Sequence, residues 1–165
     1  MFRKVIVPVL LIAVFVLSAC TKNLHGGGVV TLLSVEGGQP GTASMAISFT
    51  CNDAKNKLGG ILAWNDQTNG VQFTARLPQT PVSVVFGVPT CAEAAAIAQN
   101  AGISLNLALI NTQGQQTGIA FVAVGEPGVA PDCGSKSLVT VAAEDASFGT
   151  YIAGGCLDRG KIVFQ

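Results

Sequence analysis

The chain has 165 residues, nine basic and nine acidic, so its formal net charge is zero. Charged residues make up only 11% of the chain and hydrophobic residues 49%, which suits a domain with a real core. No basic run occurs and no basic residues alternate with aromatic ones, which excludes the usual electrostatic route to nucleic-acid binding.

The chain begins with the pattern of an export signal. Arg3 and Lys4 form a short basic region, and an apolar run follows over residues 5–17. This run has the length of a signal-peptide core and is short for a membrane span. It ends in Leu17-Ser18-Ala19-Cys20, which resembles the lipobox of bacterial lipoproteins. The resemblance implies that residues 1–19 are a signal peptide that is removed by cleavage before Cys20.

The lipobox resemblance also implies acylation and a membrane partner. In that family a diacylglyceryl group is attached to the cysteine sulfur, here that of Cys20, and a third acyl chain usually follows on its amino group. Two or three chains give a lasting anchor, because each buried methylene contributes about 0.8 kcal/mol. The implied location is the cell envelope. Thr21, in place of the aspartate that retains enterobacterial lipoproteins at the inner membrane, indicates the outer membrane if the cell has one, and otherwise the outer face of the plasma membrane.

Behind the anchor, residues 20–28 are expected to form a short leash that ends in glycines, and residues 29–165 a single β domain. Apolar and polar residues alternate over residues 45–51, 71–77 and 103–109, which is typical of half-buried strands. Further strands are expected at residues 29–34, 58–64, 82–86, 117–124, 137–142, 150–153 and 161–164. Clusters of turn residues separate these segments, and Asn69-Gly70 is a good hairpin signal.

One segment departs from this pattern. Thr90 is a suitable helix N-cap with Glu93 as its capping-box partner, so the alanine-rich residues 91–99 predict a short helix. We expect this helix to cover one open end of the sheet structure. About nine short strands with one short inserted α-helix predict an all-β fold, a compact antiparallel β-sandwich or barrel, and we expect a monomer.

Four cysteines follow the lipobox, namely Cys51, Cys91, Cys133 and Cys156. An even number in an exported chain favours two disulfides. Zinc is disfavoured because no C-x-x-C pair occurs and the single histidine, His25, lies beside the anchor. Among the three possible pairings, an up-and-down strand order places the loops of Cys133 and Cys156 at the same end of the sheet. This favours Cys133–Cys156 and leaves Cys51–Cys91 to hold the helix.

A second resemblance covers most of residues 26–165, discontinuously. It rests on glycines and strand residues, namely Gly26-Gly27-Gly28, residues 43–50, residues 58–66, residues 70–73, Gly125-Glu126-Pro127-Gly128, Tyr151, Gly154-Gly155 and Gly160-Lys161-Ile162. These pieces resemble the post-COAP domain found at the ends of bacterial surface and adhesin-like proteins. The resemblance implies a fold and transfers no catalytic motif. The four cysteines, the helix and the acylated N-terminus depart from the family pattern, which puts a purely accessory role in doubt.

No group of residues marks a reaction. His25, the one candidate base, lies in the expected leash, where rigid support is lacking. The nine carboxylates fall mostly in expected turns, and no pair stands out for glycoside hydrolysis. Two loops offer oxygen ligands at a spacing that calcium accepts, Asp66 with Asn69 and Glu126 with Asp132. Neither matches a known calcium loop, so we expect no metal and no cofactor.

Trp64, the only tryptophan, ends an expected strand close to Asp66. An aromatic residue in such a place is either a binding platform or, more often, part of the core. Trp64 and Asp66 therefore form the candidate ligand surface, with core packing as the alternative.

The expected function is that of a lipid-anchored, non-enzymatic module of the cell envelope. It would bind an envelope protein or a glycan, or serve a purely structural role. The alternative is an envelope hydrolase with a carboxylate pair that the sequence does not reveal. Two partly buried carboxylates in one pocket would favour the hydrolase, and an exposed apolar patch around Trp64 would favour binding.

Overall fold

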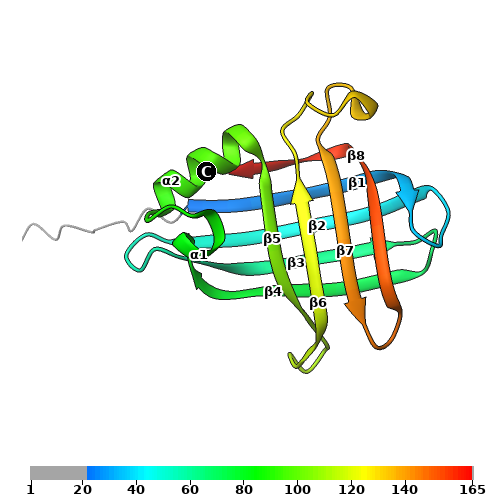
Figure 1. Cartoon of the computed structure of the whole chain (residues 1–165), viewed down its shortest axis with the longest axis horizontal. Helices are drawn as coiled ribbons and strands as arrows, with labels where there is room; N and C mark the ends of the chain where they lie inside the picture. The colour runs from blue at the N-terminus through cyan, green and yellow to red at the C-terminus, as the bar shows by residue number, and fades with distance from the viewer. Residues whose placement is uncertain (1–21, 165) are drawn as a thin grey trace, which may run out of the picture.

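The strands of the computed structural model, which describes residues 22–164, close into one antiparallel barrel (Figure 1). The eight strands are β1 (Lys22–Val35), β2 (Gly41–Asn52), β3 (Lys57–Asp66), β4 (Val71–Pro81), β5 (Ile103–Ile110), β6 (Gln116–Val124), β7 (Leu138–Asp145) and β8 (Gly149–Phe164). Two helices, α1 (Val82–Phe86) and α2 (Cys91–Ala101), lie between β4 and β5, and a single 3₁₀ turn, Pro131–Cys133, precedes β7. The signal segment 1–19, Cys20 and Thr21 lie outside the described residues.

Each strand pairs with the next one in the chain, and β8 pairs with β1. The all-β prediction is confirmed, and the closed ring selects the barrel over the sandwich. Strands β1–β4 run across Figure 1, and β5, β6, β7 and the first part of β8 cross them, whereas the last part of β8 runs beside β1. Closure pairs the edges of the sheet except where β4 and β5 separate, which limits a common route to aggregation.

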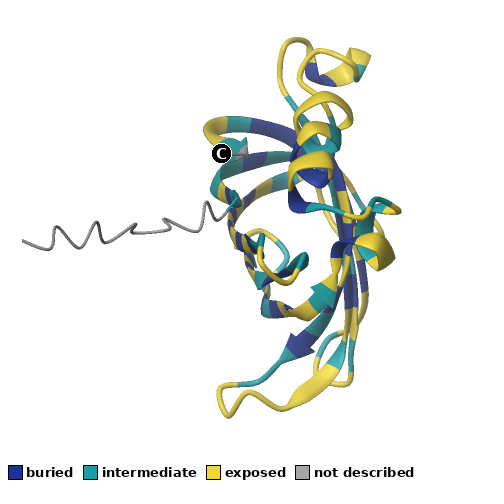
Figure 2. Ribbon diagram, turned by 90° about the vertical axis from the view of Figure 1, so that its left-hand side faces the viewer, coloured by how far each residue is buried: buried dark blue, intermediate teal, exposed yellow. Residues whose placement is uncertain are grey.

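Alternation along the strands fills the interior. In β2 the odd-numbered residues from Ala43 to Cys51 are buried, and the small residues between them, mostly hydroxylated, are exposed. The same banding of buried and exposed residues follows the other strands (Figure 2). Trp64, Phe49 and Leu62 are among the largest buried side chains, and they belong to one continuous core. The barrel interior is therefore a packed hydrophobic core.

Two strand predictions need correction. Residues 150–153 and 161–164, expected as separate strands, belong to the single long strand β8, whose register against β1 shifts twice. Residues 82–86, expected as a strand because they are rich in valine, form α1. Pro81 ends β4 before α1, and Gly87 ends α1 in the left-handed conformation with φ 72°. One helical turn accommodates Pro81 before it and the left-handed Gly87 after it better than a strand does.

The leash prediction for residues 20–28 is also wrong for the described part. Residues 22–28 belong to β1 and pair with β2 on one side and β8 on the other. The three glycines, expected at the end of the leash, instead allow three strands to approach closely. A Cβ on Gly27 would lie 2.1 Å from the carbonyl oxygen of Met45, and one on Gly28 would lie 1.6 Å from that of Arg159.

The inserted helix is confirmed as α2. The Thr90 side chain accepts a hydrogen bond from the backbone N–H of Glu93, and the Glu93 carboxylate accepts one from the backbone N–H of Thr90. Strands β4 and β5 pair only near Ala75 and Leu109, and both helices lie at the unpaired ends of these strands, after Pro81 and before Ile103 (Figure 1). As expected, the helical segment covers an opening that the strands leave.

The structure contains both favoured disulfides. Cys51–Cys91 joins the end of β2 to the first turn of α2, and Cys133–Cys156 joins the 3₁₀ turn to β8. Near the second bond, Asp158 of β8 forms an ion pair with Lys136 and accepts a hydrogen bond from the Thr31 hydroxyl. The disulfides thus fix the two longest connections of the barrel to its wall.

Candidate functional site

Trp64 and Asp66, which were expected to form a ligand surface, are buried. The exposed fraction is 2% for Trp64 and 0% for Asp66, because both residues occupy the inward register of β3. The Trp64 indole N–H donates to the hydroxyl of Tyr151 (3.2 Å), and that hydroxyl donates to Asp66 (2.8 Å). Burial and the adjacent Asp66 carboxylate raise the pKa of Tyr151, so the phenol stays a donor. The core alternative is the correct one.

The Asp66 carboxylate also holds the β3–β4 turn. It accepts the backbone N–H groups of Thr68 and Asn69 at 3.0 Å each and the Asn69 side-chain amide at 2.8 Å. The Asn69 amide oxygen accepts the backbone N–H of Gln39 in the β1–β2 turn (2.9 Å). The Asp66 and Asn69 oxygens that were considered for calcium are thus engaged by protein donors.

The other candidate groups do not come together either. His25 lies exposed on β1 instead of in a leash. Glu126 and Asp132 are exposed in the β6–β7 loop. Within residues 22–164, no three histidine, cysteine, aspartate or glutamate residues are placed to share a metal ion.

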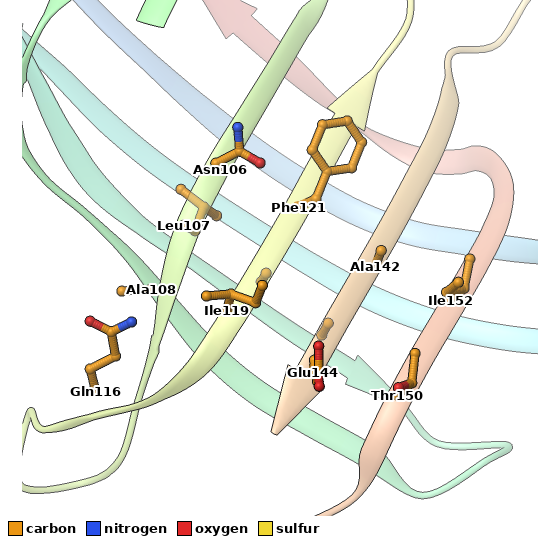
Figure 3. A pocket seen from close by; sticks show the side chains of 12 residues that line it. Asn106, Leu107, Ala108, Gln116, Ile119, Phe121, Ala142, Glu144, Thr150 and Ile152 are labelled. Carbon is orange, nitrogen blue, oxygen red and sulfur yellow. The ribbon is translucent and has the colours of Figure 1, made fainter. Parts of the chain in front are cut away.

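The feature that does form a site is a groove of about 580 Å³ on the outer face of β5–β8 (Figure 3). Most of its lining consists of outward residues in two rows across the four strands. The first row is Asn106, Phe121, Ala142 and Ile152, and the second is Ala108, Ile119, Glu144 and Thr150. We call this feature the outer groove.

The outer groove owes its shape to side-chain size. Ala108 and Ala142 give a low floor, whereas Ile119, Phe121 and Ile152 rise beside them from β6 and β8 (Figure 3). The exposed fraction is 59% for Ile119 and 39% for Ile152. Exposed aliphatic residues scattered singly are ordinary, but several that line one depression indicate a binding surface.

A single charged side chain, Glu144, lines the outer groove. The next residue, Asp145, points to the other face of β7 and accepts hydrogen bonds from the Ser147 backbone N–H (2.8 Å) and hydroxyl (2.6 Å). Hydrogen bonds from Ser147 and Thr117 hold the pKa of Asp145 below its usual value.

One sequence signal could have located the outer groove. In residues 119–124, apolar side chains occupy both parities of β6, so its outward face is as apolar as its inward face. A strand of this kind indicates cover on both sides.

The chain matches no protein-family model, and comparisons with curated proteins and with solved structures also find no match.

Proposed function

We propose that this chain is a lipid-anchored protein of the cell envelope that acts by binding and performs no catalysis. The anchor is the acylated Cys20, on the outer membrane where the cell has one and otherwise on the outer face of the plasma membrane. The lipobox pattern supports the anchor. Two disulfides support an oxidising compartment outside the cytoplasm.

The proposed binding function rests on the outer groove. Its apolar floor and flanking isoleucines suit the apolar side chains of an envelope protein better than a glycan, because the lining holds one aromatic residue, Phe121, which is only partly exposed. Glu144 would pair with a basic residue beside those side chains. The partner is thus a protein segment with apolar residues next to a lysine or arginine.

Photo-crosslinking in cells tests this function. A photoreactive phenylalanine analogue placed at Ile119 or at Ile152 is expected to give the same adduct. The same analogue at Ser44, exposed on the outer face of β2, is the matched control and is expected to give none. Glu144→Lys is expected to reduce the adduct roughly tenfold, because a like charge replaces an attractive one in the contact.

Two outcomes would count against this assignment. Equal adducts at Ile119, Ile152 and Ser44 would mean that the outer groove has no special partner. An adduct of twice the chain mass would identify a second copy of the chain and contradict the proposed monomer.

A further inference from the structure

We propose that the end of the barrel that carries α1 docks on the anionic surface of a lipid bilayer. This inference rests on the proposed lipid anchor and adds to it the face that the barrel turns toward the membrane. Three features of this end carry the inference, namely its position in the chain, its exposed apolar side chains and its charge.

The position follows from chain length and strand pairing. One residue, Thr21, lies between Cys20 and Lys22, so the extended chain from Cys20 to Lys22 spans at most about 7 Å. Lys22 pairs with Cys51 at the end of β2, and Lys57, at the start of β3, pairs with Pro81, the residue before α1. We call the start of β1, the β2–β3 turn and α1 together the anchor corner.

Hydrogen bonds and a disulfide make the anchor corner one unit. The Val82 backbone N–H of α1 donates to the Asn56 carbonyl (2.9 Å), and the Cys91 backbone N–H of α2 donates to the Asn56 side chain (3.2 Å). The Cys51–Cys91 disulfide holds the same place covalently. An acyl anchor at Cys20 therefore brings α1 to the bilayer together with the first residues of β1.

The apolar character of this end is concentrated in the helices. Val82–Ala101 has a mean hydropathy of 1.4, high enough for a membrane span by composition, and only 22% of it is buried. The segment does not form one continuous helix, because Gly87 ends α1 and Thr90 begins α2. Val84 of α1 has an exposed fraction of 74%, the highest among the large hydrophobic residues described. Such a short apolar tip suits contact with the bilayer interface and does not cross it.

The charges complement an anionic surface. Lys22, Lys55 and Lys57 lie in the anchor corner, and Asp53 is the acidic residue among them. At the opposite end, Glu36 lies in the β1–β2 turn and Asp145 ends β7, and both residues are acidic. A negatively charged bilayer attracts the first end and repels the second, which orients the barrel.

Lysine footprinting of the acylated protein on vesicles tests the orientation. The protein is reconstituted on vesicles of phosphatidylcholine, alone or mixed with phosphatidylglycerol, and exposed lysines are labelled with an amine reagent. Labelling of Lys55 and Lys57 is expected to fall on the order of fivefold when phosphatidylglycerol is present, the shift expected from one lysine near such a surface. Lys136, in the β6–β7 loop, is the internal reference and is expected to keep its labelling.

Matched variants separate docking from anchoring. Val84→Asp changes an exposed side chain of α1 and is expected to restore Lys55 labelling, whereas Ile119→Asp, on the outer groove, is expected to leave the protection intact. Equal labelling of Lys55 on both vesicle types, with protein that floats with the vesicles, would overturn the docking proposal alone. Protein that does not float with either vesicle type would overturn the anchor, and docking with it.

Discussion

Replacing Gly27 with alanine is expected to destabilise the barrel by roughly 3 kcal/mol or more, the sum of a backbone clash and local strain. Gly27 lies in β1 between Ala46 of β2 and Lys161 of β8, so it belongs to the seam that closes the ring. Its φ of 154° is one that residues with a side chain rarely adopt. The added Cβ would lie 2.1 Å from the Met45 carbonyl oxygen, a backbone atom that no rotamer change can move.

Thermal unfolding followed by circular dichroism measures this effect. A loss of this size corresponds to a decrease in Tm on the order of 10 °C for a chain of this length. Gly125→Ala is the matched control, because its added Cβ would meet no atom closer than 3.7 Å. Equal melting temperatures for the two variants would show that the close approach of β1 to its neighbours is not what requires glycine at position 27.

Replacing Asp66 with alanine is expected to cost roughly 3–5 kcal/mol, as the loss of a buried charged acceptor usually does. Asp66 is the one charged residue that is buried within the part of the chain that the structure describes. Its removal leaves the buried Tyr151 hydroxyl without its acceptor, and it frees the β3–β4 turn, whose Asn69 loses two hydrogen bonds. Asp66→Asn keeps one acceptor oxygen and is expected to lose less stability than Asp66→Ala.

Urea unfolding followed by tryptophan fluorescence measures this loss of stability, and the protein's own tryptophan serves as the probe. Trp64 is the only tryptophan and lies next to the substituted network through its hydrogen bond to Tyr151. Asp145→Ala is the control, because it removes a carboxylate that caps an exposed turn. If Asp66→Ala unfolded at the same urea concentration as the unaltered protein, the network would be shown to contribute nothing to stability.

The sequence predicted those features that depend on local pattern. The capping pair Thr90 and Glu93 located α2, because a helix start is fixed by residues three apart. Alternation located β2, β4 and β5 for the same reason. The disulfide pairing also followed, since it needs only the end of the sheet at which each loop lies.

Features that depend on strand packing were missed. Glycines indicate either a flexible leash or a close approach of strands, and only the neighbours of Gly27 decide between the two. Residues 61–64 do not alternate in polarity, so the sequence did not show that Ile61 points outward and Trp64 inward. The outer groove was missed because its two rows come from four strands whose relative register is set by pairing.

The most direct test of the central claim, a lipid-anchored and disulfide-bonded envelope protein, is the intact mass of the native protein after thiol alkylation. The account predicts the mass of residues 20–165 plus acyl chains, with no alkylation before reduction. After reduction, Cys51, Cys91, Cys133 and Cys156 are expected to be alkylated. A mass without acyl chains, or cysteines alkylated before reduction, would contradict the account.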